Sequence, residues 1–246
     1  MIQAHGRRKL NQEDLRFVVT TLGRPGEKET TLLQLLADPD TRDAILDHPV
    51  LFARLQEKGP TPPISLFLYF YLLCRQALRE HGIDDRATTD YLASLLAEFA
   101  RGNRAYRVHA QSQKEYQYLV DLMNDMLSAS TEEEFYLRSH LGDYALFLTG
   151  IFPAFIYHRA KYHPPSPDFS YYEQVGSSNY HLAAQHAMAE RYRLSGILEL
   201  LGREFRRVRL ALNHLADNYL QLDRNPGATD KVMRRLDHFI EQRRGN

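Results

Sequence analysis

Apolar side chains recur at intervals of three and four residues along most of the chain, which is the spacing of one face of an α-helix. Strand signals are scarce. The β-branched run RFVVTT at 16–21 follows NQED, which is typical of a helix cap and an acidic first turn. The pattern predicts an all-α protein, a multi-helix bundle of about 10–12 helices. The expected helices lie near 12–22, 29–37, 39–47, 49–58, 63–81, 86–101, 112–128, 131–150, 153–162, 171–189, 196–222 and 230–243.

Capping residues mark several of the expected helix starts. Asp38 precedes Pro39, an arrangement that suits an N-cap followed by the first helical residue. Ser130 and Glu133 have the spacing of a capping box, and so do Ser170 and Glu173. These boxes predict helix starts at about 131 and 171.

The most regular apolar repeat lies near the C-terminus and predicts one long helix at 196–222. Its spacings alternate between four and three over four heptads, which is typical of a coiled-coil seam. The seam consists of Leu194, Leu198, Leu201, Phe205, Val208, Leu212, Leu215, Tyr219 and Leu222. Two interpretations remain open: self-association through residues 194–222 as a homodimer, or packing of this helix on its own bundle. We expect a single helical domain over 1–246, with a small N-terminal subdomain at 1–60 and a C-terminal helix and tail at 230–246.

Charge and hydropathy favour a soluble protein that binds neither nucleic acid nor membrane. The 246 residues contain 31 Lys plus Arg and 31 Asp plus Glu, so no global field attracts nucleic acid. The apolar runs at 64–74 and 144–157 are too short for a transmembrane helix, which needs about 20 residues. The N-terminal MIQAHGRRKL has no apolar run behind its basic residues, so no secretory signal is indicated and a cytoplasmic location is expected.

Motifs of several enzyme classes are missing from the sequence. It contains neither phosphate-binding motif, G-x-x-x-x-G-K-[ST] or G-x-G-x-x-G, nor the G-x-S-x-G nucleophile elbow. No Glu-x-x-His pair of the di-iron bundles and no H-E-x-x-H zinc motif occurs. The one cysteine, Cys74, ends an apolar run and is expected to be a buried, inert residue. The sequence leaves any cofactor unknown, and it assigns no residue as a metal ligand.

Histidine and tyrosine are concentrated between residues 140 and 186, and Asp143 lies in a long apolar stretch there. A buried carboxylate must be paired, bind a metal or take up a proton. Asp143 is therefore expected either to pair internally, with His140 or a distant arginine, or to act on a ligand in a pocket. The candidate ligand-binding residues are His140, Asp143, Tyr144, His158, Tyr172 and His181.

The proline-rich stretch HRAKYHPPSPDFSYYEQ at 158–174 is interpreted as a rigid connector between two helices. Its cations suit the last turn of a helix, and Pro164, Pro165 and Pro167 end that helix. A binding rim of tyrosines around the connector is the alternative.

The segments LGDYALFLTGIFP at 141–153 and DFSYYEQVGSSNYHLAAQH at 168–186 resemble members of an uncharacterised bacterial family of helical proteins. The resemblance extends from about residue 60 to 222. It implies a bacterial cytoplasmic protein of helical fold, with no activity, cofactor or catalytic residue to carry over.

These observations favour a non-enzymatic helical interaction or scaffold protein. The alternative is a helical protein that binds a small ligand or a metal through the pocket of residues 140–181, with an enzyme at the same place as a third hypothesis.

Overall fold

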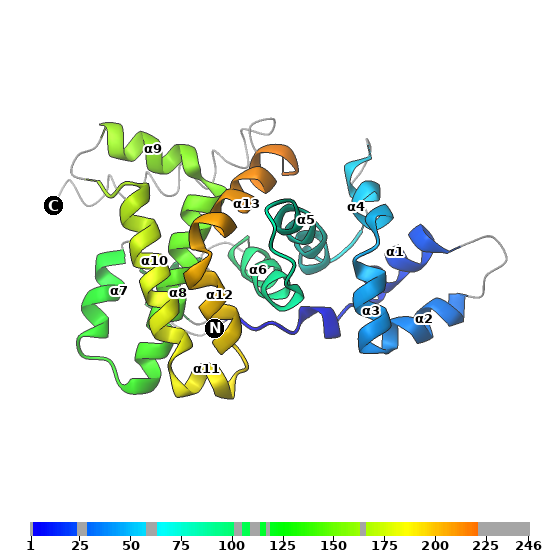
Figure 1. Cartoon of the computed structure of the whole chain (residues 1–246), viewed down its shortest axis with the longest axis horizontal. Helices are drawn as coiled ribbons and strands as arrows, with labels where there is room; N and C mark the ends of the chain where they lie inside the picture. Colours follow the sequence, from blue (N-terminus) through cyan, green and yellow to red (C-terminus); the bar gives the residue numbers. More distant parts are fainter. Residues whose placement is uncertain are drawn as a thin grey trace.

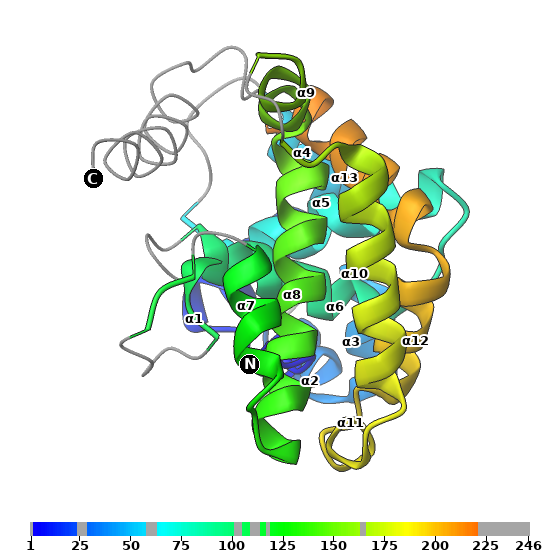
Figure 2. The same cartoon turned by 90° about the vertical axis from the view of Figure 1, so that its left-hand side faces the viewer.

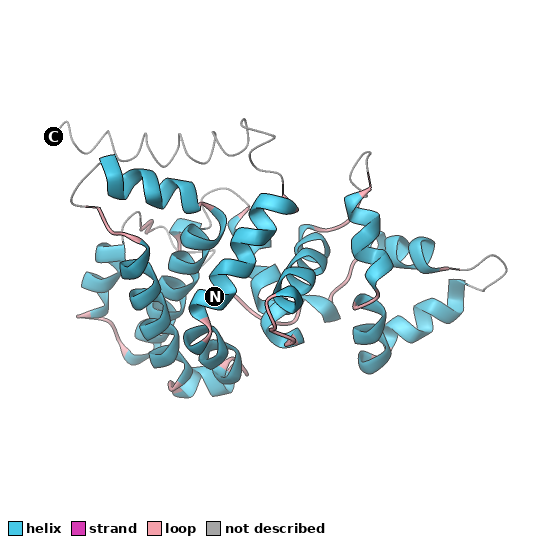
Figure 3. Cartoon of the chain, turned by 45° about the horizontal axis from the view of Figure 1, so that its top comes forward, coloured by secondary structure: helices cyan, strands magenta, loops and turns pink. Residues whose placement is uncertain are grey.

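The computed structural model describes residues 2–23, 29–57, 63–100, 105–108, 114–116, 119–162 and 166–220. Within these ranges Figure 3 shows helices joined by loops and no strand, and the predicted all-α class is confirmed. The helices are a short 3-10 helix η1 (Gly6–Arg8), α1 (Gln12–Leu22), α2 (Glu29–Ala37), α3 (Pro39–Leu46), α4 (Pro49–Gln56), α5 (Leu66–Glu80), α6 (Arg86–Phe99), α7 (Leu119–Met126), α8 (Thr131–Ile151), α9 (Pro153–Tyr162), α10 (Phe169–Ala184), α11 (Ala187–Arg191), α12 (Ser195–Arg203) and α13 (Phe205–Asn218).

The helices form an elongated molecule with α1–α4 at one end and α7–α10 at the other (Figure 1). The antiparallel pair α5 and α6 lies between these ends, and α12 and α13 connect the pair to α8 and α10. Figure 2 shows α7, α8 and α10 side by side, with α7 on the outside of the molecule. No described helix has both the length and the apolar character that crossing a membrane would require.

Glycines allow the central helices to pack closely. A Cβ added at Gly176 on α10 would lie 2.4 Å from the Phe205 ring of α13, and one at Gly142 on α8 would lie 2.7 Å from the Tyr180 ring. Gly150 meets Leu212 in the same way, at 2.8 Å. Because interiors are packed as densely as organic crystals, these positions have no room for a larger residue. Gly176 therefore lies at a close crossing of α10 with α13.

We expect Gly176→Ala to lower the free energy of unfolding by about 1–3 kcal/mol, because the new methyl group would overpack the contact with Phe205. The matched control is Gly196→Ala on α12, where no atom lies within 4 Å of the added Cβ. That change should be neutral or stabilising by less than about 1 kcal/mol, because alanine is the better helix former. Urea unfolding followed by circular dichroism measures both, and equal effects would contradict the packing argument.

Two of the predicted helix starts are confirmed and one is wrong. Asp38 accepts a hydrogen bond from Thr41 N at 3.0 Å, and Ser130 and Glu133 form the capping box of α8. The box at Ser170 does not form, because α10 begins earlier, with Asp168 as its N-cap. Glu173 instead accepts a hydrogen bond from Arg209 Nε at 2.7 Å.

Three long predicted helices are shorter or divided. The helix predicted at 112–128 begins only at α7, because Tyr116 donates its backbone N–H to Tyr106 O and is held outside a helix. The helix predicted at 171–189 ends at Ala184. His186 then caps α11 by accepting a hydrogen bond from Met188 N.

The single helix predicted at 196–222 is divided at Glu204 into α12 and α13. Ser177 Oγ donates to Gly202 O at 2.8 Å and so occupies a carbonyl of the helix at the break. A side chain inserted into the ladder of backbone bonds is a recognised cause of a kink.

The apolar seam on α12 and α13 faces the interior of its own bundle. Seven of its members are buried: Leu194, Leu198, Leu201, Phe205, Val208, Leu212 and Leu215. The structure thus gives these side chains a packing role within one chain, and self-association through residues 194–222 stays a prediction. Leu222, the helix predicted at 230–243, and Pro164 and Pro165 of the connector lie outside the described residues.

Candidate functional site

Asp143 lies in the core on α8, and its predicted burial is confirmed by a side-chain exposure of 2%. Two of its hydrogen bonds come from tyrosines on neighbouring helices. Tyr91 on α6 donates to Oδ1 at 2.7 Å, and Tyr180 on α10 donates to the same atom at 2.9 Å. These bonds link α6, α8 and α10 at one carboxylate. They also satisfy its charge, and a buried charge is tolerated only when it is satisfied in this way.

Both tyrosine hydroxyls are strongly held in the protonated form. Burial, followed by the nearby Asp143 carboxylate, raises the pKa of Tyr91 and of Tyr180 well above the usual value. At neutral pH they are donors to the carboxylate, not acids or bases. This arrangement indicates that Asp143, Tyr91 and Tyr180 stabilise the core, and it gives little support to a catalytic role for them.

His140 and Tyr144 lie beside Asp143 on the same helix. They are one turn apart, and their rings are stacked with centroids 6.4 Å apart and an interplanar angle of 19°. Phe99 of α6 meets the His140 ring edge-on at 5.9 Å. The rings of His140 and Tyr144 are both buried. The structure therefore brings together three of the six predicted ligand-binding residues.

The other three lie on different faces and helices. His158 is exposed on α9, with its ring 4.6 Å from that of Tyr162. Tyr172 is buried two turns before Tyr180 on α10, about 12 Å along the helix axis. His181 points toward α12, where its Nδ1 lies 3.1 Å from Glu199 Oε2. His158, Tyr172 and His181 are therefore close to Asp143 in the sequence, but they do not share a surface with it in the structure.

The N-terminal segment, residues 2–11, is fastened to α6 by one buried carboxylate. Asp90 accepts hydrogen bonds from Gly6 N at 2.9 Å, Arg7 N at 3.1 Å and Arg7 Nε at 3.0 Å. Arg7 also forms an ion pair with Asp43 of α3. We call these contacts the Arg7 clasp; they hold the N-terminal segment and the α1–α4 end of the molecule against α6.

A second group of hydrogen bonds fixes the start of α1 on the start of α5. Asp14 completes a capping box with Asn11, and its carboxylate accepts from Ser65 N at 2.8 Å and Ser65 Oγ at 2.9 Å. Ser65 in turn caps α5 by accepting from Leu68 N. Two helix starts are thus stabilised by one shared set of side chains.

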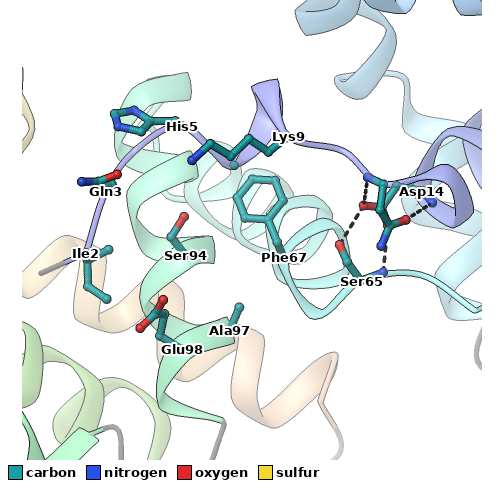
Figure 4. Close-up of a pocket in the computed structure, with 12 residues that line it drawn as sticks. Ile2, Gln3, His5, Lys9, Asp14, Ser65, Phe67, Ser94, Ala97 and Glu98 are labelled. Atoms are coloured by element: carbon teal, nitrogen blue, oxygen red, sulfur yellow. Dashed lines mark hydrogen bonds between the residues drawn. The ribbon is translucent and has the colours of Figure 1, made fainter. Parts of the chain in front are cut away.

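Between these two attachments lies a cleft of about 350 Å³, which we call the N-terminal cleft (Figure 4). Its lining combines Lys9 and His5 from the N-terminal segment with Ser94 and Glu98 from α6. Figure 4 shows the Lys9 side chain crossing Phe67, with its ammonium end on the side of Ser94. The remaining lining residues are Ile2, Gln3, Gly6, Asn11, Asp14, Ser65, Phe67 and Ala97.

A second cleft, of about 460 Å³, lies where α7 is followed by α8. It contains the carboxylates of Asp125 and Glu133 and the rings of Tyr116 and Tyr136, with Lys114 paired to Asp125. Neither cleft is lined by any of the six residues predicted from the sequence.

Metal binding and thiol chemistry have little support in the described part of the chain. No group of three or more His, Cys, Asp or Glu residues there is arranged to hold a metal ion. Burial raises the pKa of the Cys74 thiol, which is fully enclosed in α5, so the expected inert role is consistent with its surroundings.

Comparisons with known proteins place the chain in no family: no protein-family model matches it, and no curated protein or solved structure is similar to it. The resemblance noted from the two central segments therefore stays a prediction.

Proposed function

We propose that the protein is a non-enzymatic helical interaction protein that binds a partner through the outer face of α7. The exposed apolar surface, which we call the α7 stripe, consists of Val120 and Met123 on α7 and of Leu127 in the turn that follows the helix. Their side chains are 54%, 38% and 88% exposed.

The apolar surface of α7 extends beyond the side of the helix that packs against α8. Leu122 is buried, and Met126 packs against the core, so one side of the helix already faces α8. Val120 and Met123 occupy a second arc, because a spacing of three places them on one face of the helix, and Leu127 follows directly after the last helical residue. A contiguous exposed apolar face of this kind marks an interaction site more often than a single exposed leucine does.

Charge around the stripe favours a basic partner. Residues 119–134 contain five acids, Asp121, Asp125, Glu132, Glu133 and Glu134, and no lysine or arginine. The cleft beside α8 lies past the end of the stripe and adds the carboxylates of Asp125 and Glu133, of which Asp125 is paired with Lys114. Pairing of two copies through α7 would bring like charges together. The partner that fits is therefore an amphipathic helix with basic residues beside its apolar face.

A ligand-binding function at residues 140–181 has less support. Asp143 is already bound by two tyrosine hydroxyls, and its neighbours His140 and Tyr144 are buried. The interaction hypothesis rests instead on side chains that a partner can reach.

The test uses a labelled helical peptide of leucine and lysine and a matched peptide of leucine and glutamate, with fluorescence anisotropy as the measurement. The wild-type protein should prefer the lysine peptide. The variant Val120→Ser/Met123→Ser/Leu127→Ser should bind that peptide at least about tenfold more weakly, which corresponds to about 1.4 kcal/mol.

The matched control is Val50→Ser/Leu182→Ser/Leu210→Ser, three exposed apolar residues on three separate helices. It removes three exposed apolar side chains, 43%, 47% and 43% exposed, without touching the stripe. Equal binding of both peptides, or equal losses in both variants, would show non-specific adhesion and refute the proposal.

A further inference from the structure

A segment near the C-terminus, outside the described residues, has the chemistry that the α7 stripe is proposed to bind. The sequence predicts a helix at residues 230–243. Val232, Leu236 and Phe239 are separated by four and three residues, so one face of that helix would carry all of them, with Ile240 beside Phe239. Residues 231–244 contain five lysines and arginines and two acids. The sequence therefore predicts an amphipathic helix with a net positive charge.

The surface around the α7 stripe has the opposite charge. Residues 119–134 contain five acids and no lysine or arginine. Cations from outside this segment balance two of the acids, since Lys114 pairs with Asp125 and Arg138 pairs with Glu134. The other acids give the surface a net negative charge, which attracts a basic helix and orients it.

The helix that leads to the C-terminal segment lies close to the stripe, because α13 and α7 both contact the first residues of α10. Arg209 of α13 donates to Glu173 Oε1 at 2.7 Å, and its guanidinium lies 5.2 Å from the centre of the Phe169 ring. Tyr171, between these two residues in the sequence, donates its hydroxyl to Met123 Sδ of the stripe at 3.8 Å. The start of α10 is thus in contact with α13 on one side and with the stripe on another.

The chain between α13 and the predicted helix is long enough to reach the stripe. Ten residues, 221–230, follow Leu220, and they can extend about 33–36 Å. The way back along α13 from Asn218 to Arg209 is about 14 Å, and the width of α10 adds about 10–12 Å. A tether of this length also keeps the segment at an effective concentration on the order of millimolar near its own stripe, which favours it over the same segment of a second copy.

We propose that residues 230–243 dock on the α7 stripe of the same chain and compete there with the basic helix of a partner. The face of Val232, Leu236 and Phe239 covers the stripe, and the lysines and arginines pair with the acids of residues 119–134. This inference rests on the interaction function proposed for the stripe and adds a regulation of it. The apparent affinity for a partner is reduced to the extent that the segment occupies the stripe.

The first experiment measures the affinity of the full chain for the labelled peptide of leucine and lysine by fluorescence anisotropy. The variant Leu236→Ser/Phe239→Ser/Ile240→Ser should bind the peptide at least about tenfold more tightly than the wild type, a difference of about 1.4 kcal/mol, because the stripe is no longer occupied. The matched control is His238→Ser/Glu241→Ser, two residues on the opposite face of the predicted helix, and its affinity should equal that of the wild type.

The stripe variant Val120→Ser/Met123→Ser/Leu127→Ser separates the two proposals. If it binds the peptide more weakly while the C-terminal variant binds it no more tightly than the wild type, the docking is refuted and the interaction function stands. If the stripe variant binds the peptide as well as the wild type, the interaction function is refuted, and the docking with it.

The second experiment detects the docked segment directly by double electron–electron resonance between nitroxides at Thr131→Cys and Glu241→Cys. Thr131 is exposed at the start of α8, and Cys74 is buried, so the label attaches to the introduced cysteines. One narrow distance is expected in the doubly labelled chain, and it should broaden after Leu236→Ser/Phe239→Ser/Ile240→Ser. A broad distribution without those substitutions would overturn the proposal. So would a narrow distance in a mixture of singly labelled chains, because the segment would then dock on a second copy.

Discussion

Replacement of Asp143 by alanine is expected to lower the free energy of unfolding by about 2–6 kcal/mol, because two hydroxyls lose their acceptor and each such loss costs about 1–3 kcal/mol. Tyr91 and Tyr180 are fully buried, so water cannot replace the carboxylate without opening the contact between α6, α8 and α10. Urea unfolding followed by far-ultraviolet circular dichroism measures the loss. A large loss of stability indicates a structural carboxylate, whereas a carboxylate kept for a ligand should cost little stability when it is removed.

Two further variants identify the cause. Asp143→Asn keeps an acceptor oxygen, so it should cost clearly less than the alanine change. The triple variant Asp143→Leu/Tyr91→Phe/Tyr180→Phe removes donors and acceptor together and should recover part of the stability, because replacing all partners of a buried polar group by apolar ones is often nearly neutral. An alanine variant as stable as the wild type would show that the three-helix junction contributes nothing. Loss of ligand binding in a stable asparagine variant would favour the pocket hypothesis instead.

Local signals in the sequence were sufficient to predict most of the helices. Asp38 and the Ser130–Glu133 box could be recognised because a cap needs only residues within one turn of each other. The same rule failed at Ser170, where Asp168 two residues earlier was an equally good cap and the tertiary contact of Glu173 with Arg209 decided between them. A choice between two neighbouring caps depends on what the rest of the fold does with each side chain.

The break between α12 and α13 could not be predicted from its own segment. The heptad spacing continues across Glu204 without interruption, since the apolar residues on both sides face the same core. The kink instead follows from Ser177, 25 residues earlier, which donates to Gly202 O. A periodic pattern shows which face is buried, and it does not show whether the axis is straight.

The candidate site was predicted only in part for a related reason. The burial of Asp143 follows from its apolar neighbours in sequence, but its tyrosine partners lie 52 and 37 residues away. His158 and His181 were grouped with it by their density along the chain, whereas helix rotation directs His181 to α12 and leaves His158 exposed. The N-terminal cleft was missed entirely. Its one local signal is the cationic run HGRRK at 5–9, which lacks the helical pattern of the rest, and the acids that receive it lie on α3 and α6.

The second large effect on stability is expected at the Arg7 clasp. Replacing Asp90 by alanine should cost about 3–5 kcal/mol, because it leaves Arg7 without one of its two carboxylates and two backbone N–H groups without an acceptor. Asp90 is 1% exposed, so solvent does not screen these contacts as it does on a surface. Urea unfolding measures the loss, and limited trypsin digestion should show faster cleavage after Arg7 and Arg8 once the N-terminal segment is released.

Asp84→Ala is the matched control, since Asp84 also pairs with an arginine, Arg75, but has a side chain that is 66% exposed. Because the carboxylate is exposed and the buried Arg75 keeps its second partner, Asp47, the loss should be about 1 kcal/mol or less. In the double variant Arg7→Ala/Asp90→Ala the loss should fall short of the sum of the two single losses by about 0.5–3 kcal/mol, because residues in direct contact are not additive. Additive losses, or an unchanged cleavage rate after Asp90→Ala, would mean that the N-terminal segment is held by its apolar contacts alone. The position of the N-terminal segment beside the cleft would then depend on the packing of Ile2 and Phe67 and not on Asp90.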